Sequence, residues 1–94
     1  MDLVRAHVVV EGLVQGVYFR ANIAEKAGSL GVAGWVRNNS NDAVEAVFEG
    51  GKDAVNKVIE WCRIGPVGAR VDNISVRWEE YNGEFNGFSV RYGR

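Results

Sequence analysis

The 94-residue sequence is poor in cysteine, proline and histidine, with one residue of each. The single cysteine, Cys62, excludes an intramolecular disulfide and fits a reducing compartment. With so few Cys and His side chains, the sequence holds no dedicated metal cluster, and we expect no metal site. No apolar run approaches transmembrane length, and residues 1–5 lack the long apolar segment of a signal peptide. These absences predict a cytoplasmic protein that does not act at a membrane.

The sequence also lacks an excess of charge of either sign. Its 11 basic and 12 acidic residues give a formal net charge of −1 and a pI of about 5.8. Such a chain has no overall attraction for polyanions, so nucleic acid is not an expected partner and any phosphate recognition must be local. The length and the apolar share of 47% fit a single domain over residues 1–94 with a modest core.

Residues 11–20, Glu-Gly-Leu-Val-Gln-Gly-Val-Tyr-Phe-Arg, connect a strand pattern to a helix pattern. Gly12 and Gly16 bracket a loop that can turn where other residues would resist. A loop that leads into a helix N-terminus gathers unpaired backbone N–H groups, which bind anions. Arg20 follows in the first helical turn, and its planar guanidinium matches phosphate or carboxylate oxygens. The stretch indicates a small phosphate site, although such loops are more often ordinary connections.

Hydrophobic periodicity predicts the regular elements. Two-residue alternation predicts strands, and the 3.6-residue period predicts helices. The strands are expected at 3–11, 32–38, 43–49, 71–81 and 87–92, and the helices at 20–30 and 52–63. This order predicts an α+β, ferredoxin-like split βαβ fold: βαββαβ plus a short C-terminal strand, with two helices on one face of an antiparallel sheet. The usual strand order is 4-1-3-2, and the edge that the last strand joins is left open.

Turn chemistry marks two connections. Residues 39–42, Asn-Ser-Asn-Asp, tolerate left-handed conformations and predict a hairpin between the second and third strands. Asn82-Gly83 is a strong signal for another tight turn.

Several side chains are expected to be structural. Cys62 continues the apolar stripe of the second helix, where it is a small buried residue rather than a nucleophile. Tyr18 and Phe19 are expected to anchor the loop in the core, and Trp78 to face inward from its strand. His7 lies on a strand without an evident catalytic partner, so it receives no catalytic role. Arg37 and Arg70 are interpreted as surface charges.

Residues 12–20 resemble the signature of the acylphosphatase family, G-x-V-Q-G-V-x-F-R. Three further family motifs follow in the same order: Gly34-Trp35-Val36-Arg37-Asn38 with Val44-Glu45, then Gly65-Pro66-Val67-Gly68-Ala69-Arg70-Val71, and finally Phe88-Ser89-Val90-Arg91-Tyr92. Together they span nearly the whole chain. One departure is Asn41-Asp42, where the family commonly has Asp-Gly at the hairpin turn. It affects the strain of that turn rather than the chemistry.

The resemblance implies hydrolysis of the carboxyl–phosphate mixed anhydride of acyl phosphates, giving a carboxylate and inorganic phosphate. In the family, the arginine that ends the first motif binds the phosphoryl group, and the asparagine that ends the second positions the attacking water. These positions are Arg20 and Asn38 here. The residues that would supply backbone N–H groups to the phosphate are Gln15, Gly16, Val17, Tyr18 and Phe19. The family needs no metal or other cofactor, and nothing in the sequence demands more than a monomer.

The sequence leaves alternative interpretations open. Asn38 precedes a turn, where asparagine side chains usually just close backbone hydrogen bonds. The chain could also be a non-catalytic domain that binds acyl or carbamoyl phosphate. An RNA-binding module of the same element order is a weaker alternative, because the pI is acidic and residues 87–90 resemble its octamer only faintly and on the wrong strand.

Overall fold

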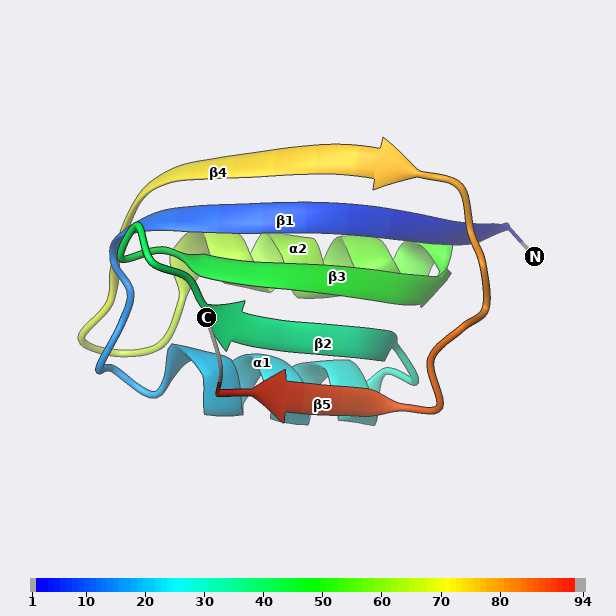
Figure 1. The fold of residues 1–94 in the computed structure, drawn as a ribbon, viewed down its shortest axis with the longest axis horizontal. Helices are drawn as coiled ribbons and strands as arrows, with labels where there is room; N and C mark the ends of the chain where they lie inside the picture. The colour runs from blue at the N-terminus through cyan, green and yellow to red at the C-terminus, as the bar shows by residue number, and fades with distance from the viewer. Residues whose placement is uncertain (1, 93–94) are drawn as a thin grey trace.

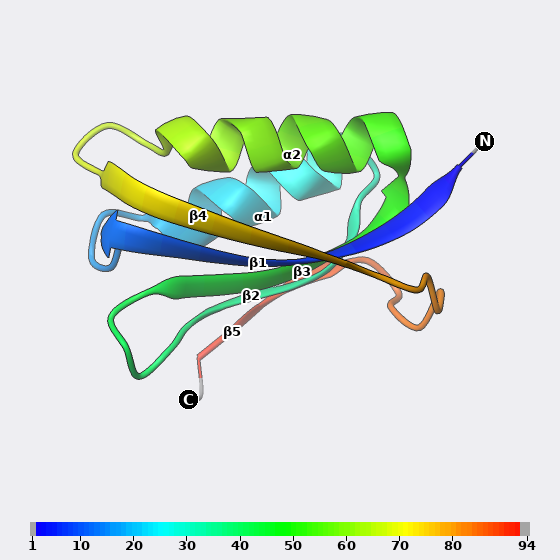
Figure 2. The same ribbon diagram turned by 90° about the horizontal axis from the view of Figure 1, so that it is seen from above.

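The computed structural model describes residues 2–92 and consists of one sheet covered on one face by two helices (Figure 2). The sheet has five strands in the order β4-β1-β3-β2-β5 (Figure 1). The strands are β1 (Leu3–Leu13), β2 (Ala33–Asn38), β3 (Val44–Gly51), β4 (Arg70–Glu79) and β5 (Phe88–Arg91). The helices are α1 (Phe19–Ser29) and α2 (Lys52–Ile64). Neither helix among these residues is long and apolar enough to cross a membrane.

The predicted elements and the predicted 4-1-3-2 order are confirmed, with boundaries shifted by one or two residues. The description of the sheet as antiparallel is wrong at one edge. β5 pairs with β2 in parallel, whereas the other three pairings are antiparallel. Phe88 of β5 stacks on Phe48 of β3, with ring centroids 5.7 Å apart. This edge therefore gives the apolar face of β5 a place in the core, which explains why the last strand joins here.

Alternating residues of the strands and one stripe of each helix form the core. Ala6, Val8 and Val10 of β1 are fully buried, as are Val44 and Phe48 of β3. The helices contribute Phe19, Ile23 and Ala27 from α1 and Val55, Val58, Ile59 and Cys62 from α2. The stripe predicted for the second helix, including the burial of Cys62, is confirmed.

Two expectations for β4 and its exit need comment. Trp78 faces the helix side of the sheet as expected, since it pairs with buried Ala6, but it is 51% exposed, because it lies at an open groove that Leu3, Tyr81 and Asn56 of α2 also line. Asn82-Gly83 does not form a hairpin turn, because β4 and β5 lie at opposite edges of the sheet. Residues 80–87 instead pass around one end of the sheet to reach β5 (Figure 1).

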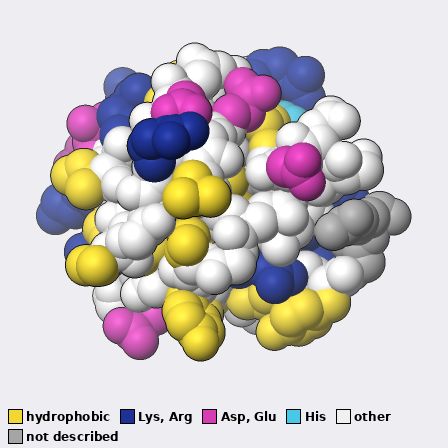
Figure 3. Space-filling model, turned by 90° about the vertical axis from the view of Figure 1, so that its left-hand side faces the viewer, with side chains coloured by type: hydrophobic (Ala, Val, Ile, Leu, Met, Phe, Trp, Pro, Cys, Tyr) yellow, Lys and Arg dark blue, Asp and Glu magenta, His cyan; other side chains and the backbone are white. Residues whose placement is uncertain are grey.

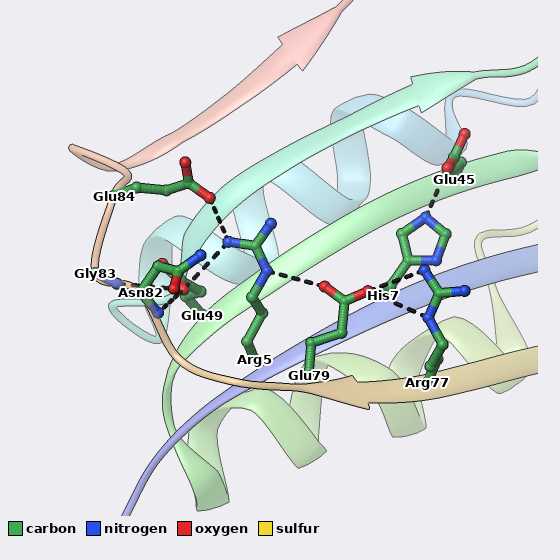
Figure 4. Close-up of polar contacts among 9 residues, drawn as sticks. All are labelled: Arg5, His7, Glu45, Glu49, Arg77, Glu79, Asn82, Gly83 and Glu84. Carbon is green, nitrogen blue, oxygen red and sulfur yellow. Dashed lines mark hydrogen bonds and ion pairs between the residues drawn. The ribbon is translucent and has the colours of Figure 1, made fainter.

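A cluster of charged side chains holds this long connection against the sheet (Figure 4). Arg5 of β1 donates hydrogen bonds to the carboxylates of Glu49, Glu79 and Glu84. Glu49 is only 2% exposed and also accepts hydrogen bonds from the backbone N–H groups of Asn82, at 2.8 Å, and of Gly83, at 3.3 Å. We call Arg5, Glu49, Glu79 and Glu84 the carboxylate clasp. It secures the segment that brings β5 to its place beside β2.

Gly12 is a strand residue rather than part of the phosphate loop. The pairing of β1 with β4 shifts register between Glu11 and Gly12, which is the mark of a β-bulge. Gly12 has φ 136°, and a Cβ atom at this position would overlap the carbonyl oxygen of Arg70. The bulge bends the end of β1 just before the chain enters the loop over residues 14–18.

Candidate active site

One cavity of about 350 Å³ lies where the loop, the start of α1 and the ends of β2 and β5 meet. Its lining residues are Val14, Gly16, Tyr18, Phe19, Arg20, Ala21, Asn38, Val90 and Tyr92. Arg20 and Asn38 are far apart in the sequence, yet they line the same cavity. In Figure 3, which shows this end of the molecule, hydrophobic side chains are scattered over the surface, and a Lys or Arg group lies beside one of them near the lower edge.

The loop has a backbone shape suited to anions. Gly16 has φ 77° and Tyr18 has φ 61°, whereas Val17 between them does not have a positive φ. Turn conformations of this kind, which residues 15–18 adopt, can point successive N–H groups toward one side, the arrangement of an anion-binding nest. Within residues 2–92, these three N–H groups donate no backbone hydrogen bond outside regular elements. A non-glycine residue such as Tyr18 in this conformation costs on the order of 1–3 kcal/mol, and such strain concentrates at functional sites.

The N-terminus of α1 opens toward the same cavity. Tyr18 occupies the N-cap position without making a side-chain cap, and the first turn carries no acidic residue. The first turn of α2, by contrast, carries Asp53. The partial positive charge at the start of α1 is therefore left for a bound anion.

Arg20 differs from most arginines of this protein in lacking a carboxylate partner among the described residues. Arg5, Arg37, Arg63, Arg70 and Arg77 all form ion pairs with Asp or Glu. The guanidinium of Arg20 instead lies over the ring of Tyr92, with its Cζ atom 5.0 Å from the ring centroid. This contact leaves its N–H groups available to a ligand in the cavity.

The side chain of Gln15 ties the loop to the β2–β3 hairpin. Its Nε2 atom donates to the carbonyl oxygens of Asn39, at 3.1 Å, and of Ala43, at 2.9 Å. The Oδ1 atom of Asn39 accepts from the backbone N–H groups of Asn41 and Ala43, and Asp42 adopts the left-handed conformation expected at this turn, with φ 62°. These bonds fix the end of β2, and hence Asn38, relative to the loop.

Not every residue expected at the site lines the cavity. Gly16, Tyr18, Phe19, Arg20 and Asn38 do, whereas the other two expected residues do not. The expectation that aromatic residues anchor the loop is confirmed for Phe19, which is 1% exposed, and wrong for Tyr18, which is 82% exposed. The left-handed backbone of the tyrosine directs its side chain outward, and periodicity cannot anticipate this.

Gln15 and Val17 are the two expected residues that are absent from the cavity lining. The side chain of Gln15 is engaged with the hairpin, and Val17 packs against the core. Four lining residues were not predicted from the sequence: Val14, Ala21, Val90 and Tyr92. Val90 and Tyr92 could not be placed, because they reach the cavity only through the parallel pairing of β5 with β2.

Other titratable groups lie outside the cavity. Burial raises the pKa of the Cys62 thiol to about 12, so it is not a thiolate nucleophile at neutral pH. His7 Nε2 lies 2.6 Å from Glu45 Oε2, and Arg37 donates to the other oxygen of the same carboxylate. Burial pushes the pKa of Glu45 upward, but these two hydrogen bonds outweigh it and hold the pKa below its usual 4.5. Residues 2–92 contain no cluster of three or more His, Cys, Asp or Glu side chains suited to a metal ion.

Comparison with known proteins gives a consistent result. The family model described as acylphosphatase matches residues 6–90. An acylphosphatase of Pyrobaculum calidifontis is 59% identical over 91 residues, which cover 96% of this chain and 83% of that protein. The structure of an acylphosphatase from Coxiella burnetii superimposes with a TM-score of 0.90 at 37% identity, covering 96% of this chain and 94% of the other. One from Bacillus subtilis gives 0.90 at 32% identity, covering 97% and 100%. The chain therefore belongs to the acylphosphatase family.

Proposed function

We propose that this chain hydrolyses acyl phosphates to a carboxylate and inorganic phosphate in the cavity at the start of α1. The observation that carries the proposal is that Arg20 and Asn38 line one cavity together with the loop residues Gly16 and Tyr18. The reaction needs no metal ion, and the protein acts as a monomer in the cytoplasm, with a small acyl phosphate as its partner.

The loop and Arg20 bind the phosphoryl group. The N–H groups of Gly16, Val17 and Tyr18 and the open N-terminus of α1 supply donors and partial positive charge. The guanidinium of Arg20 adds two parallel N–H groups that match two phosphoryl oxygens. Phosphoryl transfer through a loose transition state depends mainly on positioning and charge stabilisation, which these groups provide.

Asn38 positions the water that attacks phosphorus. Its neutral amide cannot act as a base, so a phosphoryl oxygen of the substrate accepts the proton of the water. The departing carboxylate is weakly basic, and the reaction therefore needs no strong general acid. This chemistry agrees with a cavity whose lining, as far as residues 2–92 form it, contains no His, Cys, Asp or Glu.

Phosphate release from benzoyl phosphate in the presence of EDTA tests the proposal. Arg20→Lys should lose about 10²–10³ in kcat while folding normally, because a single ammonium cannot reproduce the two-pronged contact. The matched control is Arg63→Lys, which changes an exposed arginine of α2 that pairs with Glu60. Near-normal turnover by Arg20→Lys would refute the assignment, and loss of activity in EDTA would refute metal independence.

A second variant separates the role of Asn38 from simple binding. Asn38→Ala should lower kcat more than it raises KM, since the lost contact acts in the transition state. The control is Asn73→Ala on exposed β4, where the amide donates to Glu11. A change confined to KM would assign Asn38 to substrate binding. Phosphate binding without turnover by the wild type would instead support the non-catalytic domain.

A further inference from the structure

Tyr92 is the one aromatic side chain that contacts the guanidinium of Arg20 among the described residues. It follows β5 directly, is 79% exposed, and lines the cavity together with Val90 and Asn38. Arg5, Arg37 and Arg91 also lie over aromatic rings, but among the described residues none of these three arginines lines the cavity. The contact of Tyr92 with Arg20 is made at the cavity itself, which points to a role at the site.

The type of contact matters for what Arg20 can do. A free arginine side chain populates many rotamers, and immobilising it costs up to about 2 kcal/mol of conformational entropy. A carboxylate partner could hold it, as in the carboxylate clasp, where Arg5 donates to three glutamates. Such a partner would occupy the N–H groups that a phosphoryl group needs. An aromatic ring attracts the face of the guanidinium and leaves the N–H groups at its edge free.

We infer that Tyr92 is a positioning residue: its ring holds the guanidinium of Arg20 ready for the phosphoryl group without competing for its N–H groups. This inference rests on the proposed function, because it assigns to Arg20 the role of phosphoryl ligand. Removing the ring leaves Arg20 in place but disordered, so the phosphoryl group must order it on binding. The loss of kcat/KM should therefore be small, and it should depend on the ring of Tyr92 and on Arg20 but not on the acyl group of the substrate.

The first test compares three substitutions at position 92. Tyr92→Ala and Tyr92→Leu should lower kcat/KM by about two- to fivefold, the usual strength of a cation–π contact at an exposed site. Tyr92→Phe should restore normal kcat/KM, because it keeps the ring face and removes only the hydroxyl. The control is Tyr81→Ala, a partly exposed tyrosine outside the cavity. Normal kinetics for Tyr92→Ala, or failure of Tyr92→Phe to rescue, would overturn the inference.

The second test uses two substrates that share the phosphoryl group and differ in the acyl group. If Tyr92 acts through Arg20, Tyr92→Ala should weaken turnover of acetyl phosphate and benzoyl phosphate by the same factor. A loss confined to benzoyl phosphate would mean that the ring contacts the acyl group, and the positioning role would be wrong. In an Arg20→Ala background, which removes the cation that the ring holds, Tyr92→Ala should cause no further loss. Equal losses in both backgrounds would show that Tyr92 acts independently of Arg20.

Titration with inorganic phosphate separates this inference from the proposed function. A wild type without turnover refutes the hydrolase proposal, and phosphate affinity then decides the role of Tyr92. Phosphate should bind Tyr92→Ala about two- to fivefold more weakly than wild type and Tyr92→Phe equally well. Unchanged affinity for Tyr92→Ala, or no phosphate binding by the wild type, would refute the positioning role.

Discussion

Substituting Gly12 by alanine tests whether the β-bulge at the end of β1 holds the fold in place. Gly12 has φ 136°, and an added Cβ would overlap the carbonyl oxygen of Arg70 and lie 2.8 Å from the backbone nitrogen of Asp72. Both neighbours are backbone atoms of β4, so neither can swing away as a side-chain tip could. Relief requires β1 and β4 to separate near the bulge.

The structure sets the size of the effect. Forcing alanine into this conformation costs on the order of 1–3 kcal/mol. Separating the strands also removes backbone hydrogen bonds, each worth about 0.5–1.5 kcal/mol. We expect Gly12→Ala to lose about 3 kcal/mol or more of a total stability that is on the order of 5–14 kcal/mol for a chain of this length. For so small a domain, 3 kcal/mol lowers Tm by about 12–24 °C.

Urea and thermal unfolding measure this change, and Gly28→Ala is the matched control. Gly28 lies inside α1 without a positive φ, and nothing lies within 4 Å of an added Cβ. The same chemical change there should raise stability by about 0.5–1 kcal/mol, because alanine is the better helix former. A Gly12→Ala protein within about 1 kcal/mol of wild type would show that the strain at the bulge does not constrain the chain.

Three further outcomes are expected. Because the folded protein holds the pKa of Glu45 below its unfolded value of 4.5, the ionised carboxylate stabilises the fold above pH 4.5, and this stability is lost as the pH falls through the folded pKa. The Tm should therefore drop below a pH of about 4.5. The drop should be less steep in Glu45→Gln, and equal slopes of Tm against pH in the two proteins would contradict this. Cys62 should resist a thiol reagent at pH 8 until the protein unfolds, and rapid native labelling would disprove its burial. Glu49→Gln weakens the carboxylate clasp and should lower the free energy of unfolding, measured in urea, by about 1–3 kcal/mol. The control Glu60→Gln, at an exposed position, should change this free energy by less than about 0.5 kcal/mol.

Periodicity predicted the elements of the fold because each has a buried face with a clear repeat. β3 alternates Val44, Ala46 and Phe48 inward, and α2 carries its apolar stripe at helical spacing. The last strand could not be placed on the same grounds. Its four residues, Phe88–Arg91, show which side is apolar but not which edge they join. Asn82-Gly83 pointed to a local turn, whereas the clasp formed by residues distant in sequence determined the actual path.

Part of the candidate site could likewise be predicted from the sequence, and part could not. Arg20 and Asn38 were identified from the motifs that contain them, and the structure brings both to one cavity. The outward direction of Tyr18 depends on a single left-handed residue, which no pattern of polarity encodes. The position of Tyr92 depends on the pairing of β2 with β5, which lie about fifty residues apart in the chain. The local sequence therefore does not indicate that Tyr92 contacts Arg20.

The two arginines at opposite ends of the sheet show how the same side chain is used in two ways. Arg5 is surrounded by Glu49, Glu79 and Glu84, and its pKa is raised because hydrogen bonds to these carboxylates outweigh the effect of burial. It holds the path of the chain to β5, with its Nε and Nη1 groups donating to the three carboxylates. That path places Tyr92 over Arg20, which has no carboxylate partner among the described residues. The clasp thus concentrates negative charge away from the cavity, and the cavity keeps an arginine whose N–H groups remain available to a phosphoryl group.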